Sequence, residues 1–167
     1  MKKYLSVALS RGRAYYMAAN DIKGKELTSK QLLDGVPRKH LMSSGGIDRL
    51  ESAKDFMVSN DYVKDMVAHR RPSHPDEFAG YEILLEKLLA RGPVVVVFDI
   101  LPGYQDYDGK HSVVVTGCGV GLVEGNLIEF WQNHDSQDPT WGVNGFGQLA
   151  RRNGLIVAAV EFQVNGG

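Results

Sequence analysis

The stretch KHSVVVTGCGVGLVEGNLIEFWQNHDSQDPTWGVNGFGQLAR, Lys110–Arg151, decides the fold of this chain. His111 stands at the start of a β-branched run that continues to Val115. A second apolar run, Leu127–Trp131, follows after a glycine-rich segment, and this pattern predicts two strands joined as a hairpin. Asn133 comes just past the expected end of the second strand, so the hairpin would hold an imidazole and a carboxamide side by side.

An asparagine at this place could accept the ring N–H of His111 and fix the tautomer of the imidazole. Each residue also has a plain structural interpretation. His111 would then be a half-buried strand histidine bonded to Asn133, and Asn133 a turn residue at a strand end. The aromatic residues of the stretch, Trp131, Trp141 and Phe146, are expected to pack in the core and the hairpin rather than form a ligand cage.

The composition bounds what the chain can be. Its 167 residues suit one domain, and 43% hydrophobic with 23% charged residues is an ordinary balance for a packed protein. A formal net charge of −1 gives no electrostatic reason to bind nucleic acid or an anionic membrane. The basic cluster of Lys64 with His69–Arg71 is predicted to be a solvated loop. No apolar run approaches the roughly 20 residues that span a bilayer, and the start is too short for a secretory signal.

Cys118 is the only cysteine, so the chain can form no intrachain disulfide. Its use of cysteine predicts a reducing compartment, the cytoplasm or the nucleus. Cys118 lies between two glycines and is expected to pack as a small apolar residue. His134 and Asp135 could ligate a metal, but no third ligand stands at a convincing spacing, so we expect a surface loop, no metal and no cofactor.

The front of the chain has helical rather than strand spacing, and the back has strand spacing. The pattern predicts one α+β domain, residues 1–167, with a mainly helical side (1–91) and a mainly β side (92–167). A helix is predicted over Tyr81–Ala90. The polar residues Glu82 and Glu86 are expected on its outer face, opposite Ile83. The other predicted elements are helices over Leu5–Ile22, Leu27–Asp34 and Ile47–Asn60, a loop over His69–Phe78, and strands over Val94–Phe98, Gly147–Arg151 and Leu155–Phe162.

Several short motifs occur in an order that resembles papain-like cysteine proteases. The back half carries four of them, His111-Ser112-Val113, Gly117-Cys118-Gly119, Gln132-Asn133 and Trp141-Gly142-Val143-Asn144-Gly145-Phe146. The front half adds three more, Leu27–Asp34, Gly45-Gly46 and Gly92–Val96. The resemblance covers most of the chain and implies a papain-like fold, with a helical N-terminal side packed on an antiparallel β-sheet or barrel. It also implies a cleft between the two sides that holds an extended peptide.

The same resemblance locates the catalytic positions. Laying Thr28–Asp34 on the family pattern without gaps brings Tyr4 onto the position of the catalytic cysteine, with His111 and Asn133 as relics of a Cys-His-Asn triad. A phenol, whose usual pKa is about 10, is a poor nucleophile at neutral pH. Residues 1–117 contain no cysteine. Ser6 or Ser10 could be proposed instead, although nothing in the sequence activates either hydroxyl.

The leading hypothesis is therefore a pseudoprotease that acts as a protein-interaction module, as a decoy or an antagonist. Its partner would be a protein or peptide in the cleft, and a homodimer could cover apolar surface. The alternative is an active papain-like thiol hydrolase, which requires a glutamine and a cysteine supplied upstream of Met1.

Overall fold

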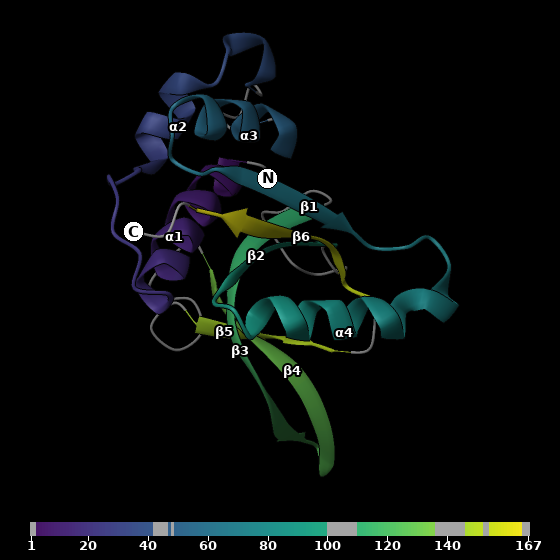
Figure 1. Cartoon of the computed structure of the whole chain (residues 1–167). Coiled ribbons are helices and arrows are strands. Elements are labelled where there is room, and N and C mark those ends of the chain that lie inside the picture. Colours follow the sequence, from purple (N-terminus) through teal and green to yellow (C-terminus); the bar gives the residue numbers. More distant parts are fainter. Residues whose placement is uncertain are drawn as a thin grey trace.

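The structure is a computed structural model that describes residues 3–41, 47, 49–99, 110–135, 146–151 and 154–164. Within these residues the strands form one antiparallel sheet in the order β1-β6-β2-β3-β4-β5, with helices on both faces (Figure 1). The elements are α1 (Lys3–Ala19), α2 (Ser29–Gly35), the 3-10 helix η1 (Arg38–His40), α3 (Leu50–Ser59), β1 (Asp65–Arg70), the 3-10 helix η2 (Pro75–Glu77), α4 (Phe78–Leu89), β2 (Val94–Asp99), β3 (Lys110–Val123), β4 (Asn126–Asp135), β5 (Phe146–Ala150) and β6 (Ile156–Gln163). The predicted α+β fold is confirmed.

The sheet is buried on both faces, which explains why its central strand is a continuous run of valines. Along β2, Val95 joins the core that α1, α2 and α3 form on one face. Its neighbours Val94 and Val96 join the core beneath α4 on the other face. Successive side chains of a strand point to opposite faces, so a strand covered on both sides needs apolar residues at every position.

Helix α1 lies unusually close to the sheet, and Gly12 permits this. A Cβ atom built on Gly12 would lie 2.3 Å from Cγ2 of Val95, a residue with no exposed surface. The glycine that weakens the helical pattern in the sequence therefore allows the helix to pack directly on β2. Helix α2 begins as the sequence predicts, with Thr28 as N-cap. Its Oγ1 accepts from the Gln31 amide at 3.1 Å, and the Gln31 side chain accepts from the Thr28 amide at 2.8 Å.

Two predictions for the middle of the chain are wrong. His69 and Arg70 lie in the edge strand β1, not in a loop, and β1 pairs with β6 along its whole length. The sequence does not predict this strand because buried and exposed residues alternate only weakly along it, and Met66 is its only buried residue. On α4 the prediction fails for two residues, since Glu82 is buried and Ile83 is 51% exposed, whereas Glu86 is exposed as predicted.

The predicted hairpin is confirmed, and β3 and β4 extend together beyond α4 (Figure 1). Glu124 and Gly125 turn the chain with φ of 50° and 82°, the positive values of a tight hairpin turn. Thr116 has no partner in the ladder, because Val115 pairs with Asn133 and Gly117 with Gln132. Such a bulge shifts the alternation of β3 by one residue relative to β4.

The prediction that Asn133 lies just past the end of its strand is wrong. Asn133 lies within β4, because β4 continues to Asp135 against β3 and β5. Cys118 is exposed, so the expectation that it packs as a small apolar residue is also wrong. Among the described residues, no helix is long and apolar enough to cross a bilayer.

Candidate functional site

Asn133 is the predicted site residue whose side chain the structure describes. It is 1% exposed and pairs across the sheet with Val115 and Gly147. Its amide nitrogen and oxygen are buried and bond to no residue in the described part of the chain. Leaving such an amide unsatisfied costs about 1–3 kcal/mol, so Asn133 is suited to orient a second polar group.

For Tyr4 and His111 the structure describes the backbone only. Tyr4 lies in the first turn of α1, and His111 pairs with Phe98 near the start of β3. The predicted contacts of the Tyr4 phenol and of the His111 imidazole, including the bond to Asn133, lie outside the described residues. Trp141 also lies outside them, whereas Trp131 is buried in the core as predicted.

One cavity adjoins both of these backbone positions. Leu5 and Ser112, which directly follow Tyr4 and His111, line the same cavity of about 120 Å³ between the helices and the sheet. Its other lining residues are Arg49, Leu50, Arg70, Val97, Val157 and Ala158. The structure therefore brings Leu5 at the start of α1 and Ser112 at the start of β3 to one hollow. A cavity of about 150 Å³ can hold a benzene ring, so this one has the size of a single side chain.

Two arginines give the rim of this cavity a positive character. Arg49 and Arg70 are both exposed, and the Arg70 guanidinium donates to the Glu51 carboxylate at 2.6 Å. A backbone hydrogen bond at Glu51, together with Arg70, holds the pKa of that carboxyl below its usual value. Arg49 makes no ion pair with a residue that the structure describes. A ligand that enters the cavity therefore meets two arginines at the rim, both of which lower the pKa of Glu51, and an apolar interior.

A buried charged cluster that local sequence patterns do not predict joins α4 to the hairpin. Arg151 is 8% exposed, and its guanidinium carbon lies 4.1 Å from the centroid of the Trp131 ring. Its Nε lies 3.8 Å from the buried Glu82 carboxylate, and its Nη2 donates to Glu86. Glu82 can face the sheet from α4 because the positive charge of Arg151 lies beside its carboxylate. The cluster fixes the helix to the sheet, and we assign it no chemistry.

The alternative nucleophiles are held in other bonds. The hydroxyl of Ser6 lies 3.0 Å from the hydroxyl of Ser29, and Ser10 donates to the Val7 carbonyl at 3.1 Å. The side chains of His134 and Asp135 lie outside the described residues. Elsewhere, no group of three or more His, Cys, Asp or Glu side chains could hold a metal ion among the residues described.

Comparison with known proteins shows which solved structures this fold resembles. No protein-family model and no curated protein sequence matches the chain. Solved structures do match. Bromelain from Ananas comosus, in complex with the E64 inhibitor, superposes with a TM-score of 0.67 at 16% identity, over 98% of this chain and 90% of bromelain. Digestive procathepsin L2 from Tenebrio molitor gives 0.65 at 18% identity, over 98% of this chain and 61% of that one.

SERA5E from Plasmodium falciparum is a third match, with a TM-score of 0.63 at 14% identity over 98% of this chain and 86% of that one. Two other SERA5E structures superpose over 60% of this chain only, and there the chain spans 46% of their length. At such identities the likeness concerns the fold alone. The chain has the papain-like fold of cysteine proteases, which confirms the fold that its motifs imply.

Proposed function

We propose that this chain is a papain-like pseudoprotease, a non-catalytic module that binds a protein or peptide in the cleft between its helical and β sides. Tyr4 stands at the nucleophile position, and His111 and Asn133 remain from a triad. Such a module would act as a decoy or an antagonist, because it offers a protease-like cleft without cutting what enters it.

The observation that carries the proposal is the place of the thiol. Cys118 and His111 both belong to β3, seven positions apart. At about 3.3 Å per residue this separation is roughly 23 Å along the strand, whereas a nucleophile and its base must lie within hydrogen-bond reach. The single thiol of these 167 residues is thus too far from the histidine to be activated by it.

The cavity between the helices and the sheet supports a binding role. Its interior is lined by Leu5, Val97 and Ala158, and it can take one apolar side chain. Arg49 at its rim suits an acidic residue next to that anchor. We therefore expect peptide ligands with an apolar residue beside a carboxylate, bound across the start of α1.

Selection from a displayed random-peptide library tests this proposal. We expect enriched peptides to bind the wild-type protein and to lose most of their affinity for Arg49→Glu, which reverses an exposed charge at the rim. Lys87→Glu is the matched control, since Lys87 is an exposed cation on α4. Thermal melts of both variants check the fold. Enriched peptides that ignore Arg49→Glu, or no enrichment at all, would argue against the proposed cleft.

An active thiol hydrolase is the second candidate, and the observation on its side is the buried amide of Asn133, which bonds to no residue that the structure describes. Against it, Asn133 pairs across the hairpin with Val115, four positions and roughly 13 Å along β3 from the backbone of His111, whereas a Cys-His-Asn site requires the amide beside its imidazole. This function would need a cysteine and a glutamine supplied upstream of Met1. It predicts labelling by a cysteine-directed inhibitor that depends on His111.

A homodimer is the third part of the proposal, and the projecting hairpin supports it. Val120, Leu122 and Leu127 are 59%, 72% and 73% exposed, and the register places all three on one face of the hairpin. Large apolar side chains gathered in this way typically mark an interaction surface. The location of the protein in the cytoplasm or nucleus stays a prediction.

A further inference from the structure

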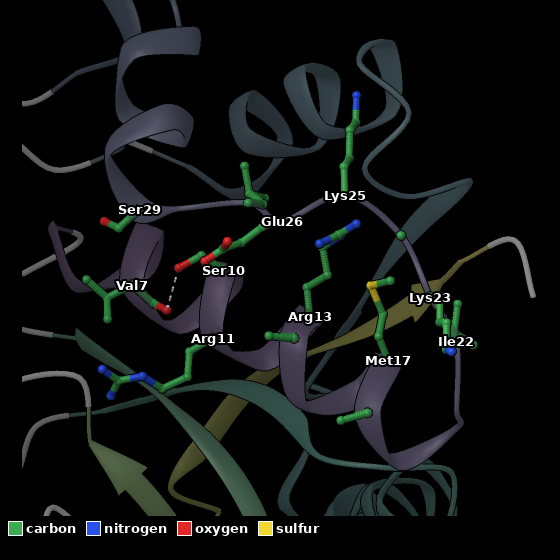
Figure 2. A pocket seen from close by; sticks show the side chains of 14 residues that line it. Val7, Ser10, Arg11, Arg13, Met17, Ile22, Lys23, Lys25, Glu26 and Ser29 are labelled. Carbon is green, nitrogen blue, oxygen red and sulfur yellow. Dashed lines mark hydrogen bonds between the residues drawn. The ribbon is translucent and has the colours of Figure 1, made fainter.

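A second, larger cavity lies on the side of α1 that faces away from the sheet. It has a volume of about 610 Å³ and lies between α1 and the segment Ile22–Ser29 that leads into α2 (Figure 2). Pockets for small molecules typically measure about 300–1,000 Å³. Much of its wall is apolar, from Val7, Ala14, Met17 and Leu27. The cavity is separate from the one beside Ser112, because the two share no lining residue.

Arg13 is the unusual residue of this wall. It occupies a position of the buried stripe of α1 that otherwise holds Leu5, Leu9 and Met17, and it is 3% exposed. Its Nε donates to the Tyr62 carbonyl at 2.7 Å, and its guanidinium carbon lies 5.4 Å from the Tyr62 ring centroid. No carboxylate in the described part of the chain pairs with it. Burial lowers the pKa of Arg13, as expected for a cation taken from water without a counterion.

The terminal nitrogens of Arg13 lie at the cavity. Nη2 is 3.7 Å from the place where a Cβ on Gly24 would stand, so the guanidinium lies along the connecting segment that walls the cavity. Figure 2 shows the Arg13 side chain between Met17 and Lys25, while Arg11 projects away from it. The Nε of Arg13 is held by Tyr62, and its terminal nitrogens are not among the buried atoms that lack a partner, so a carboxylate bound in the cavity could accept two parallel hydrogen bonds from the planar fork.

Glu26 is the acidic side chain among the residues that line this cavity. Its side chain reaches the cavity on the side of Ser10, apart from Arg13 (Figure 2). A single negative charge can bind at Arg13 with modest repulsion from Glu26. The same wall also carries Arg11, Lys23 and Lys25, so charge alone does not exclude a dianion such as phosphate, which would instead find no apolar partner. The wall therefore favours one carboxylate attached to an apolar body.

We propose that the cavity between α1 and Ile22–Ser29 is a binding site for a small apolar monocarboxylate, with the carboxylate on Arg13 and the apolar part against Met17 and Leu27. The site is independent of the proposed cleft, so either can fail without the other.

Calorimetric titration with octanoate tests the site, with octylammonium and inorganic phosphate as control ligands. Octanoate is expected to bind one site per chain. Both control ligands are expected to bind at least about tenfold more weakly, since octylammonium loses the charge-assisted contact to Arg13 and phosphate has no apolar part to pack against Met17 and Leu27. Ala14→Phe fills the cavity from an exposed position of α1 and should abolish binding without changing the melting temperature. Arg13→Met should weaken binding about tenfold or more, and Glu26→Gln should strengthen it.

These variants keep the test decisive even if Arg13→Met fails to fold, because Ala14→Phe and Glu26→Gln alter exposed residues. Three results would overturn the site. They are no octanoate binding to the wild type, equal binding to Ala14→Phe, and equal binding of octylammonium. Weaker binding to Glu26→Gln would remove the assigned role of Glu26 and the selectivity argument with it.

Discussion

Replacing Gly12 by alanine sets two opposing effects against each other, and the structure says which is larger. In an isolated helix the change would stabilise by up to about 1 kcal/mol. Here the new Cβ would lie 2.3 Å from Cγ2 of Val95, whereas carbon atoms in contact prefer about 3.5–4.0 Å. The valine cannot move aside, because it is fully buried on β2 and its side chain is stiff.

Relief therefore requires α1 to move away from the sheet, which also loosens its contacts near Val114 and Phe162. Overpacking of this kind costs about 1–3 kcal/mol. We expect the upper end, since the overlap exceeds 1 Å, and so a net loss of about 2 kcal/mol after the helical gain. For a domain of this size that corresponds to a fall of roughly 4–8 °C in melting temperature.

Gly80→Ala is the matched control. Gly80 lies in α4, and a Cβ there would meet nothing within 4 Å. The substitution should leave stability unchanged or raise it by up to about 1 kcal/mol. Urea denaturation and thermal melts of both variants measure the difference. If Gly12→Ala proved as stable as Gly80→Ala, the direct packing of α1 on β2 would be refuted.

Three further predictions concern other parts of the fold. Arg151→Met should lower the free energy of unfolding, measured in urea, by about 3 kcal/mol, because it leaves the buried Glu82 carboxylate without this cation. An unchanged free energy of unfolding would mean that the cluster does not join helix and sheet. Burial raises the pKa of Tyr81 above its usual value, so stability should fall as pH rises past about 10, and Tyr81→Phe should weaken that dependence. Leu122→Ser with Leu127→Ser should reduce self-association in sedimentation velocity, and a wild-type protein that stays monomeric at high concentration would count against the homodimer.

Local patterns explain what the sequence predicted well. The hairpin of β3 and β4, the short helix over Leu27–Asp34 and the run Val94–Phe98 each depend on neighbouring residues, so their signals lie in short windows of sequence. The helix over Leu5–Ile22 was also predicted, although the reason for Gly12 was not. That reason is a contact with Val95, more than 80 positions further along the chain.

Long-range pairing explains what the sequence could not reveal. Asn133 lies inside β4 because β5, which begins at Phe146, extends the ladder on its other side. The buried Glu82 could not be expected before Arg151 was placed against it. Arg13 does leave a signal in the sequence, because it is a charged residue in the apolar stripe of α1.

Intact-mass spectrometry after exposure to an epoxide or vinyl-sulfone probe of cysteine proteases tests the central claim that this papain-like chain is not a thiol hydrolase. The wild type, His111→Ala and Cys118→Ser are compared over time. We predict at most a slow adduct, equal in His111→Ala and absent in Cys118→Ser, as expected of an exposed, unactivated thiol. Rapid, stoichiometric labelling that requires His111 would contradict the claim and identify the modified residue as a working nucleophile.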